Sequence, residues 1–97
     1  MSAYVVVDVD VTDPSAYDVY REKAAASVAR HGGRYVARGG EMTVLEGAWS
    51  PRRLVILEFA NAESARRWYA SADYEAARDA RAGAATMNMV VVEGVVT

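Results

Sequence analysis

The pattern of apolar and polar positions first identifies two strands with matching faces. Residues Ala3–Val11 alternate, with apolar residues at every odd position and polar or aromatic ones at most even positions. Residues Arg53–Phe59 repeat this, with Val55, Leu57 and Phe59 at the odd positions. A period of two residues places the odd positions on one face of a sheet. We therefore expect two strands whose apolar faces both pack against helices.

A helix is predicted between the first strand and a pair of glycines. Asp13 can cap its first turn, and Pro14 suits the first helical position, where its missing N–H costs nothing. Gly32-Gly33 should end the helix near His31, because glycine accepts the left-handed conformation of a helix C-terminus. The buried stripe is expected at spacings of three or four residues, namely Tyr17, Tyr20, Ala24 and Val28.

The segment after these glycines carries weaker signals. Arg34–Arg38 is predicted to be a short strand, which Gly39-Gly40 bends or bulges and which resumes over Met42–Glu46. Gly47–Pro51 is predicted to be a loop that carries Trp49.

The remaining chain predicts a helix in two pieces and a final strand. Asn61 can cap the first piece, which ends near Ala70. Ser71 can cap the second piece, which spans Asp73 to about Ala84. Met87–Val96 is the last predicted strand, apolar on both faces. One face of the second helical piece should consist of Tyr74, Ala77 and Arg81.

The two halves of the chain repeat one unit. A shift of 48 residues superposes the strand, cap and helix of both halves, with Asp13 falling on Asn61. A shift of 47 residues superposes Met42–Gly47 on Met89–Gly94. Each half is then one β-α-β unit, and two units give the ferredoxin-like order β-α-β-β-α-β, an α+β fold with an antiparallel sheet. We expect residues 1–97 to form one such domain, with its second helix split in two.

The sheet face away from the helices is also apolar. An antiparallel sheet covered on one side usually exposes a polar face. Apolar area left in water costs about 25 cal/mol per Å², so a partner sheet is the expected cover. A two-fold homodimer is the commonest way to supply one, and a monomer with an open sheet is the alternative. The apolar residues on this face are Tyr4, Val6, Leu54 and Ile56. The last strand is apolar on both of its faces, with Val90, Val92 and Val96 on one and Met89, Val91 and Val95 on the other.

Composition excludes several classes of function. The net charge is −2 with both signs interspersed, so no basic surface is expected to bind nucleic acid. The chain has no cysteine, which excludes disulfides, thiolate catalysis and cysteine-based metal sites. Neither a signal-peptide pattern nor an apolar run long enough to span a membrane is found. We expect a cytoplasmic protein with no metal and no bound cofactor.

A set of short motifs then brings a resemblance into view. As a set, and over essentially the whole chain, they resemble the bacterial domain-of-unknown-function family 1330. The resemblance implies the dimeric α/β-barrel superfamily. Relatives there include cofactor-free monooxygenases, lactone isomerases and haem-handling enzymes, an analogy of fold that carries little weight for function. The motifs include Asp13-Pro14-Ser15-Ala16-Tyr17, Gly32-Gly33-Arg34-Tyr35, Leu45-Glu46-Gly47-Ala48-Trp49, Ala65-Arg66-Arg67-Trp68-Tyr69 and Val92-Glu93-Gly94.

Four charged or titratable residues are candidates for catalysis. His31, the sole histidine, is either a general acid or base or a cationic cap of its helix. Arg38 precedes a glycine bend and either clamps a carboxylate or enolate oxygen or pairs with a nearby glutamate. Glu46 and Glu58 end apolar strands and are either general bases of raised pKa or members of salt bridges with Arg38, Arg53 or Arg81.

Several aromatic residues are candidates for a ligand pocket. Trp49 is the preferred pocket residue, because packing explains a loop tryptophan poorly. Trp68 and Tyr74 are further ligand candidates, with Arg81 on the same helical face as Tyr74, although core packing is the simpler explanation for Trp68. Asp8 and Asp10 are expected to make inter-subunit polar contacts rather than to bind metal.

Two functions remain open. The first is a small-molecule site between sheet and helices, where a glutamate or His31 abstracts a proton and Arg38 stabilises the oxyanion, giving cofactor-free isomerase or monooxygenase-like chemistry. The second is a ligand-binding or dimeric assembly module without catalysis. The first site would be lined by Arg38, Glu46, Trp49, Glu58, Trp68 and Tyr74.

Overall fold

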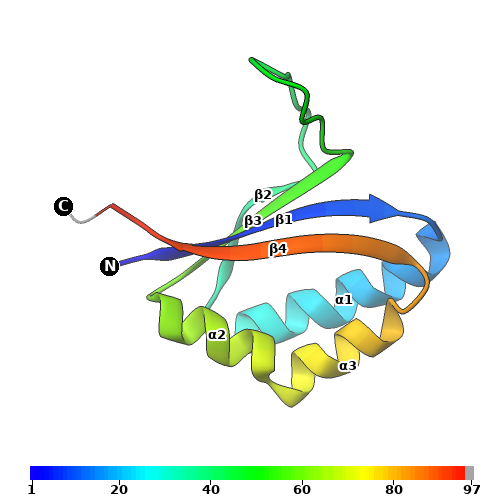
Figure 1. Cartoon of the computed structure of the whole chain (residues 1–97). Helices are drawn as coiled ribbons and strands as arrows, with labels where there is room; N and C mark the ends of the chain where they lie inside the picture. The colour runs from blue at the N-terminus through cyan, green and yellow to red at the C-terminus, as the bar shows by residue number, and fades with distance from the viewer. Residues whose placement is uncertain (96–97) are drawn as a thin grey trace.

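A four-stranded antiparallel sheet crosses the middle of the molecule (Figure 1). The computed structural model describes residues 1–95. Strand β1 (Ala3–Val11) lies between β3 (Arg53–Phe59) and β4 (Ala85–Glu93), and β2 (Arg34–Arg38) pairs with the outer side of β3. The order β2-β3-β1-β4 leaves β2 and β4 as the two edges. This is the predicted ferredoxin-like arrangement.

Three helices cover one face of this sheet (Figure 1). They are α1 (Pro14–Arg30), α2 (Ala62–Ala70) and α3 (Ala72–Ala80). The predicted caps are confirmed: Asp13 accepts from the backbone N–H of the third residue of α1, and Asn61 does the same for α2. In the described part of the chain, no helix is long and apolar enough to cross a membrane.

Ser71 splits the second helical region in two, as predicted. Its hydroxyl donates to the backbone oxygen of Trp68 at 2.7 Å, which closes the end of α2. The same hydroxyl accepts from the backbone N–H of Tyr74 at 3.2 Å, which caps the start of α3. Its extended backbone, with φ −71° and ψ 154°, interrupts the helix between these two contacts.

The core lies between the helices and the sheet face that carries the odd residues of β1. Val5, Val7 and Val9 are buried there, and Val7 lies opposite Val55 on β3 and Met89 on β4. From α1, the whole predicted stripe is buried: Tyr17, Tyr20, Ala24 and Val28.

The predicted continuation of the second strand over Met42–Glu46 is wrong. Gly39, with φ +67°, turns the chain away at the end of β2, and β3 begins only at Arg53. Residues 39–52, here called the arm, contain no helix or strand and rise on the side of the sheet opposite the helices (Figure 1). Met42–Gly47 and Met89–Gly94 are therefore similar in sequence but differ in structure.

The last elements also differ at their ends from the prediction. Helix α3 ends at Ala80, because turns occupy the following residues, and β4 begins two residues early at Ala85. Strand β4 ends at Glu93, where its pairing with Ala3 stops, so Val95 is outside the strand. Val96 lies outside the described residues.

The sheet face away from the helices has the predicted apolar character. Tyr4, Val6, Leu54 and Ile56 are each partly exposed there. Val90 and Val92 of β4 are paired with Val6 and Tyr4, and their side chains are 61% and 51% exposed. This face is called the open face below.

Candidate functional site

An aromatic cluster fills the space between α1, α2 and α3. The rings of Trp68 and Tyr74 have centroids 4.3 Å apart, and the hydroxyls of Tyr20 and Tyr74 lie 2.8 Å apart. Burial raises the pKa of both tyrosines, and for Tyr20 the adjacent Tyr74 adds to the rise. Both hydroxyls therefore stay protonated at neutral pH, where they serve as hydrogen-bonding groups.

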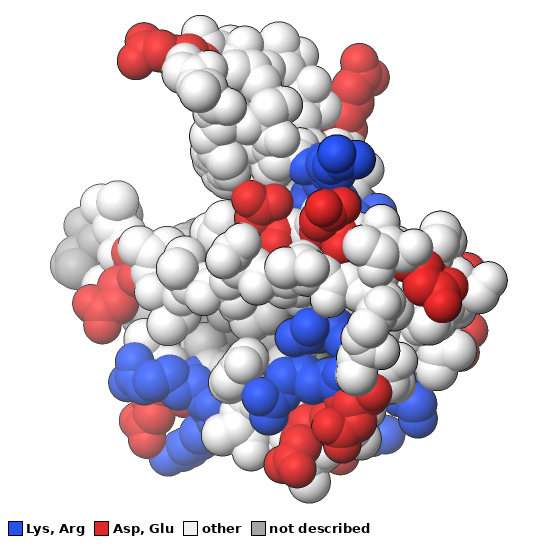
Figure 2. All heavy atoms as spheres, turned by 45° about the vertical axis from the view of Figure 1, so that its right-hand side comes forward, with Lys and Arg blue, Asp and Glu red and all other residues white. Residues whose placement is uncertain are grey.

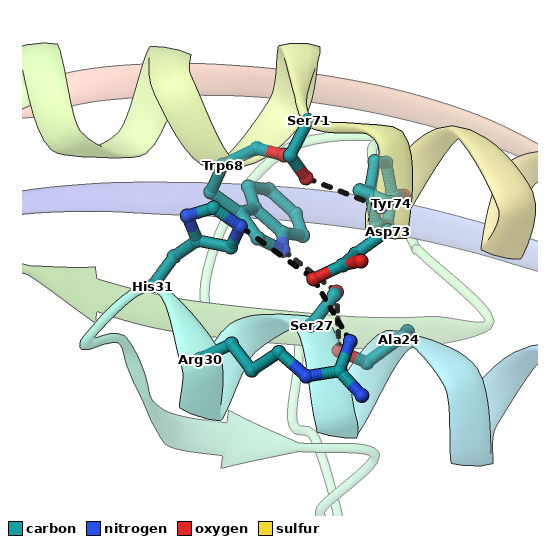
Figure 3. A network of polar contacts seen from close by, with 8 residues as sticks. All are labelled: Ala24, Ser27, Arg30, His31, Trp68, Ser71, Asp73 and Tyr74. Carbon is teal, nitrogen blue, oxygen red and sulfur yellow. Dashed lines mark hydrogen bonds and ion pairs between the residues drawn. The ribbon is translucent and has the colours of Figure 1, made fainter.

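A buried serine fixes Trp68 within this cluster (Figure 3). The indole Nε1 of Trp68 donates to the hydroxyl of Ser27 at 3.0 Å, and that hydroxyl donates to the backbone oxygen of Ala24 at 2.7 Å. Both Ser27 and Trp68 are almost fully buried. The orientation of the indole is thus set by α1 although the residue belongs to α2.

A small cavity of about 30 Å³ lies between α1 and the sheet. That volume is large enough for a water molecule and too small for an organic ligand. Three arginines from three elements line it, namely Arg21, Arg38 and Arg53, together with aromatic residues that include Tyr17, Tyr35 and Trp68.

The arginines of this cavity are held by aromatic rings more than by acids. The guanidinium of Arg38 lies 4.4 Å from the ring centre of Tyr35, and that of Arg53 lies 5.7 Å from the ring centre of Tyr17. Such cation–π contacts stabilise a cation by roughly 0.5–2 kcal/mol. Arg21 adds an ion pair with Asp18 at 3.6 Å, on the exposed side of α1. Between residues 1 and 95, Arg38 and Arg53 make no ion pair.

A larger groove of about 480 Å³ follows the inner side of the edge strand β4 and is open to solvent. Its volume suits a small organic molecule. Its lining contains no acidic side chain, and it shares Trp68, Met87 and Met89 with the small cavity. Flexible methionine side chains therefore contribute to the partition between the two spaces. The remaining lining residues are Val5, Ala65, Arg66, Tyr69, Arg81, Val90 and Val91.

Arg81 is the charged group that faces inward in this groove. Its guanidinium lies 5.6 Å from the ring centre of Tyr20, and its positive charge lowers the pKa of Tyr20 and Tyr74 against the effect of burial. The Nε of Arg81 is buried and has no acceptor among the described residues. The Nε atoms of Arg21, Arg53 and Arg78 are in the same state, but of these four arginines only Arg81 lines the groove, where its positive charge favours an anionic ligand.

The structure divides the predicted site residues among several places. Trp68 lines both the cavity and the groove, Arg38 lines the cavity, and Arg81 lines the groove. Tyr74 is fully buried behind them and touches the site through Tyr20 and Trp68. Arg38 comes from β2 and Trp68 from α2, whereas Tyr74 and the C-cap residue Arg81 both belong to α3.

Glu46 and Trp49 lie on the arm, far from these spaces in the fold. Glu46 is exposed, and the indole Nε1 of Trp49 donates to Asp8 on the open face at 3.0 Å. Asp10 lies 3.7 Å from Arg52 of the same arm. Asp8 and Asp10 thus each contact the arm of their own chain.

Glu58 lies on the open face, in a salt bridge with Arg34. Arg34 Nη2 lies 2.6 Å from Glu58 Oε1, and the hydroxyl of Tyr4 donates to Oε2 at 3.4 Å. Hydrogen bonding from Ser2, followed by the contacts with Arg34 and Tyr4, lowers the pKa of Glu58. A carboxylate held ionised in this way is a weak base, and it belongs to the sheet surface rather than to the groove.

His31 lies at the C-terminal end of α1, where it caps the helix. Its backbone N–H reaches the carbonyls of the last turn, and its Nε2 lies 3.9 Å from Asp73 at the start of α3. Arg30 approaches the same carboxylate at 2.8 Å (Figure 3). These contacts tie α1 to α3 at the surface. Within residues 1–95, no three acidic or histidine side chains gather in a way that could hold a metal ion.

Sequence reasoning missed several residues that line the two spaces. Arg21, Arg53, Met87 and Met89 were not proposed as site residues, although the alternation of β4 places both methionines on the helix side, opposite Val9 and Val7. That periodicity was a usable signal. The same alternation places Arg53 on the helix side of β3, opposite Val9 and in line with Val55, so a usable signal existed for it too.

Solved structures of similar fold come from several bacteria. A protein of unknown function from Rhodopseudomonas palustris is 16% identical with a TM-score of 0.77, covering 99% of this chain and 84% of that one. SnoaB, a cofactor-independent oxygenase from Streptomyces nogalater, is 17% identical with a TM-score of 0.65, covering 99% and 95%. A dimeric ferredoxin-like protein of unknown function from Bacteroides fragilis is 17% identical with a TM-score of 0.69, covering 96% of each chain.

The TM-scores show a common fold, and identities of 16–17% leave the activity of this chain open. Among curated proteins, none matches the chain significantly. A family described as "Domain of unknown function (DUF1330)" matches residues 2–95, which is nearly the whole sequence. The chain belongs to the DUF1330 family.

Proposed function

We propose that this protein binds a small organic anion with an apolar body in the groove beside β4. The observation that carries the proposal is Arg81, whose buried Nε has no acceptor among the described residues in a groove that no acidic side chain lines. Trp68, Tyr69, Met87 and Met89 offer the aromatic and flexible apolar wall against which such a body would pack.

Binding is better supported than acid–base catalysis by this chain's own side chains. The bases considered from the sequence, Glu46, Glu58 and His31, lie on the arm, the open face and the helix end. The groove lining itself contains no carboxylate and no imidazole. Chemistry like that of the oxygenase from Streptomyces nogalater would therefore start from a substrate that is already an anion, with Arg81 holding its negative charge.

The protein is further proposed to work as a homodimer through its open face. The support is the exposed apolar area of Val90, Val92 and their neighbours, together with the dimeric state stated for the Bacteroides fragilis protein. Covering such a face with a second copy removes apolar surface from water and requires no additional protein.

The anion site can be tested with the carboxylate 2-naphthoate as probe. The neutral amide 2-naphthamide, which has the same ring system without the charge, serves as the control ligand. Titration calorimetry of the unmodified protein should show naphthoate binding and much weaker amide binding. Arg81→Gln should weaken naphthoate by about tenfold or more, since a hydrogen bond to a charged group contributes about 1.5–3 kcal/mol. Amide binding should stay unchanged in this variant.

Arg67→Gln is the matched control, because Arg67 is an exposed arginine that pairs with Glu63 and does not line the groove. Its naphthoate affinity should equal that of the unmodified protein. The proposal is wrong if naphthoate and naphthamide bind with equal affinity. It is also wrong if Arg81→Gln, with a normal melting temperature, binds naphthoate as tightly as the unmodified protein does.

A further inference from the structure

The arm presents apolar side chains that no other described residue covers. Leu45 is 94% exposed, Val44 is 51% exposed and Trp49 is 62% exposed. Figure 2 shows this part of the molecule standing away from the body, largely uncharged and with acidic groups on it. A projection with exposed leucine and valine at its end is costly in water unless something covers it.

The base of the arm is fixed to the open face. Trp49 donates to Asp8 at 3.0 Å, and Arg52 lies 3.7 Å from Asp10, both on the sheet side away from the helices. The arm therefore leaves the sheet on the side where a second copy is proposed to lie. The arm rises from the sheet on the side away from its own helices (Figure 1).

The opposite edge of the sheet carries a matching unpaired surface. Val90, Val91 and Val92 of the edge strand β4 are 61%, 38% and 51% exposed. Val90 and Val91 also form the rim of the groove. An exposed apolar edge strand of this kind is normally covered in a native protein. The base of the arm reaches across β1 to the start of β4, beside Thr86 and Asn88, and leaves Val90–Val92 at the other end of that strand exposed in its own chain.

We infer that the arm of one protomer closes the groove of its partner, with Leu45 against the Val90–Val92 rim and Glu46 paired with Arg66. The inference rests on the homodimer proposed above and is independent of the ligand. Two sheets packed face to face about a two-fold axis parallel to their strands place the β2 edge of each over the β4 edge of the other. Each arm then leaves its own sheet toward the β4 edge of the other copy and runs along that edge from the level of Asp8 to the Val90–Val92 rim.

The length of the arm is sufficient for this contact. Packed sheets lie roughly 10 Å apart, and an extended chain advances about 3.3 Å per residue. Half of the arm, from Gly39 to about Leu45, can thus reach roughly 20 Å, which is beyond the partner's sheet and level with the space under its helices.

The charges of the two surfaces are complementary. The arm carries Glu41 and Glu46, and the groove carries Arg66 and Arg81. Among residues 1–95, none of these four side chains makes an ion pair within the chain. Arg66 is exposed at the groove on α2, whereas Arg81 lies deeper, so Glu46 meets Arg66 and leaves Arg81 for the ligand.

The absence of cysteine makes a cross-linking test direct. Leu45→Cys and Val91→Cys are made as separate single-cysteine proteins, mixed, allowed to exchange subunits and treated with a short bismaleimide. A cross-linked two-chain band between the two variants can form only between protomers. Its yield should exceed several-fold that of Leu45→Cys mixed with Glu75→Cys, an exposed control position on α3.

A charge exchange gives a second measurement on the same mixture. Glu46→Lys in the Leu45→Cys chain should reduce the yield, and Arg66→Glu in the Val91→Cys chain should restore it. Equal yields for Val91→Cys and Glu75→Cys overturn the inference. If sedimentation shows a dimer and the two cross-linking yields are equal, only the proposed arm contact is wrong. If sedimentation shows single chains, the proposed homodimer is wrong as well. The naphthoate titration tests the anion site independently of both.

Discussion

The hydroxyl of Ser27 lies 3.0 Å from the indole Nε1 of Trp68 and joins helices that are far apart in the sequence. Trp68 forms the common wall of the cavity and the groove, so this contact sets the shape of both spaces. A buried indole N–H needs an acceptor, and the hydroxyl of Ser27 on α1 supplies it.

Removal of that hydroxyl should destabilise the protein. Ser27→Ala leaves the indole N–H of Trp68 unpaired in the core, which we expect to lower the free energy of unfolding by about 1–3 kcal/mol. Urea denaturation measures the change, with Ser15→Ala on the exposed side of α1 as control. In a Trp68→Phe background, which lacks the N–H, the same serine substitution should cost much less; an undiminished cost would contradict the explanation.

Gly33 should not tolerate a side chain. A Cβ built there would lie 2.6 Å from the ring of Phe59 and 3.0 Å from Val28. We expect Gly33→Ala to reduce the stability by about 1–3 kcal/mol through overpacking. Gly40→Ala is the comparison, since a Cβ there meets open space, and its melting temperature should stay near that of the unmodified protein. If Gly33→Ala is as stable as Gly40→Ala, then Phe59 and Val28 can shift to accommodate the added methyl group without cost, and the prediction is wrong.

A charge on the open face should dissociate the proposed dimer. Val6 lies at the centre of that face, on β1 between Ile56 and Val90. Val6→Asp would bury a carboxylate between two sheets, so we expect sedimentation equilibrium to give the mass of one chain, 10.5 kDa. Val19→Asp, on an exposed position of α1, should keep the two-chain mass. A Val6→Asp dimer would place the interface elsewhere.

Acid should weaken the fold through Glu58. Its pKa is lower in the folded chain than its ordinary value near 4.5, so the ionised carboxylate stabilises the folded state. That contribution is present above the unfolded pKa and is lost as the pH falls from about 4.5 toward the lower folded pKa. Denaturation curves between neutral and acidic pH should therefore fall less steeply for Glu58→Gln than for the unmodified protein.

Glu63→Gln provides the reference for this pH series. Glu63 is an exposed residue of α2 whose ion pair with Arg67 lies on the helix surface. Such pairs contribute little to stability, so the pH profile of this variant should follow that of the unmodified protein. Identical slopes for Glu58→Gln and Glu63→Gln would show that the contacts of Glu58 with Ser2, Arg34 and Tyr4 do not stabilise the fold.

The sequence by itself determined the elements whose signals are local. Alternating valines located β1, and the caps at Asp13, Asn61 and Ser71 fixed where each helix begins. Side-chain periodicity and capping act over a few residues, so they are readable without a structure. The same periodicity showed that both faces of the sheet are apolar.

Only the tertiary structure decided which residues form the groove. Glu46 ends an apolar segment in the sequence much as a site residue does, yet the turn at Gly39 carries it onto the arm. Glu58 follows the alternation of β3, whose even positions lie on the open face, and there it pairs with Arg34. Arg81 instead gained its position from the packing of α3 against the sheet, which buries its Nε beside Tyr20. Burial and proximity are set by contacts between distant elements, and a local pattern cannot encode them.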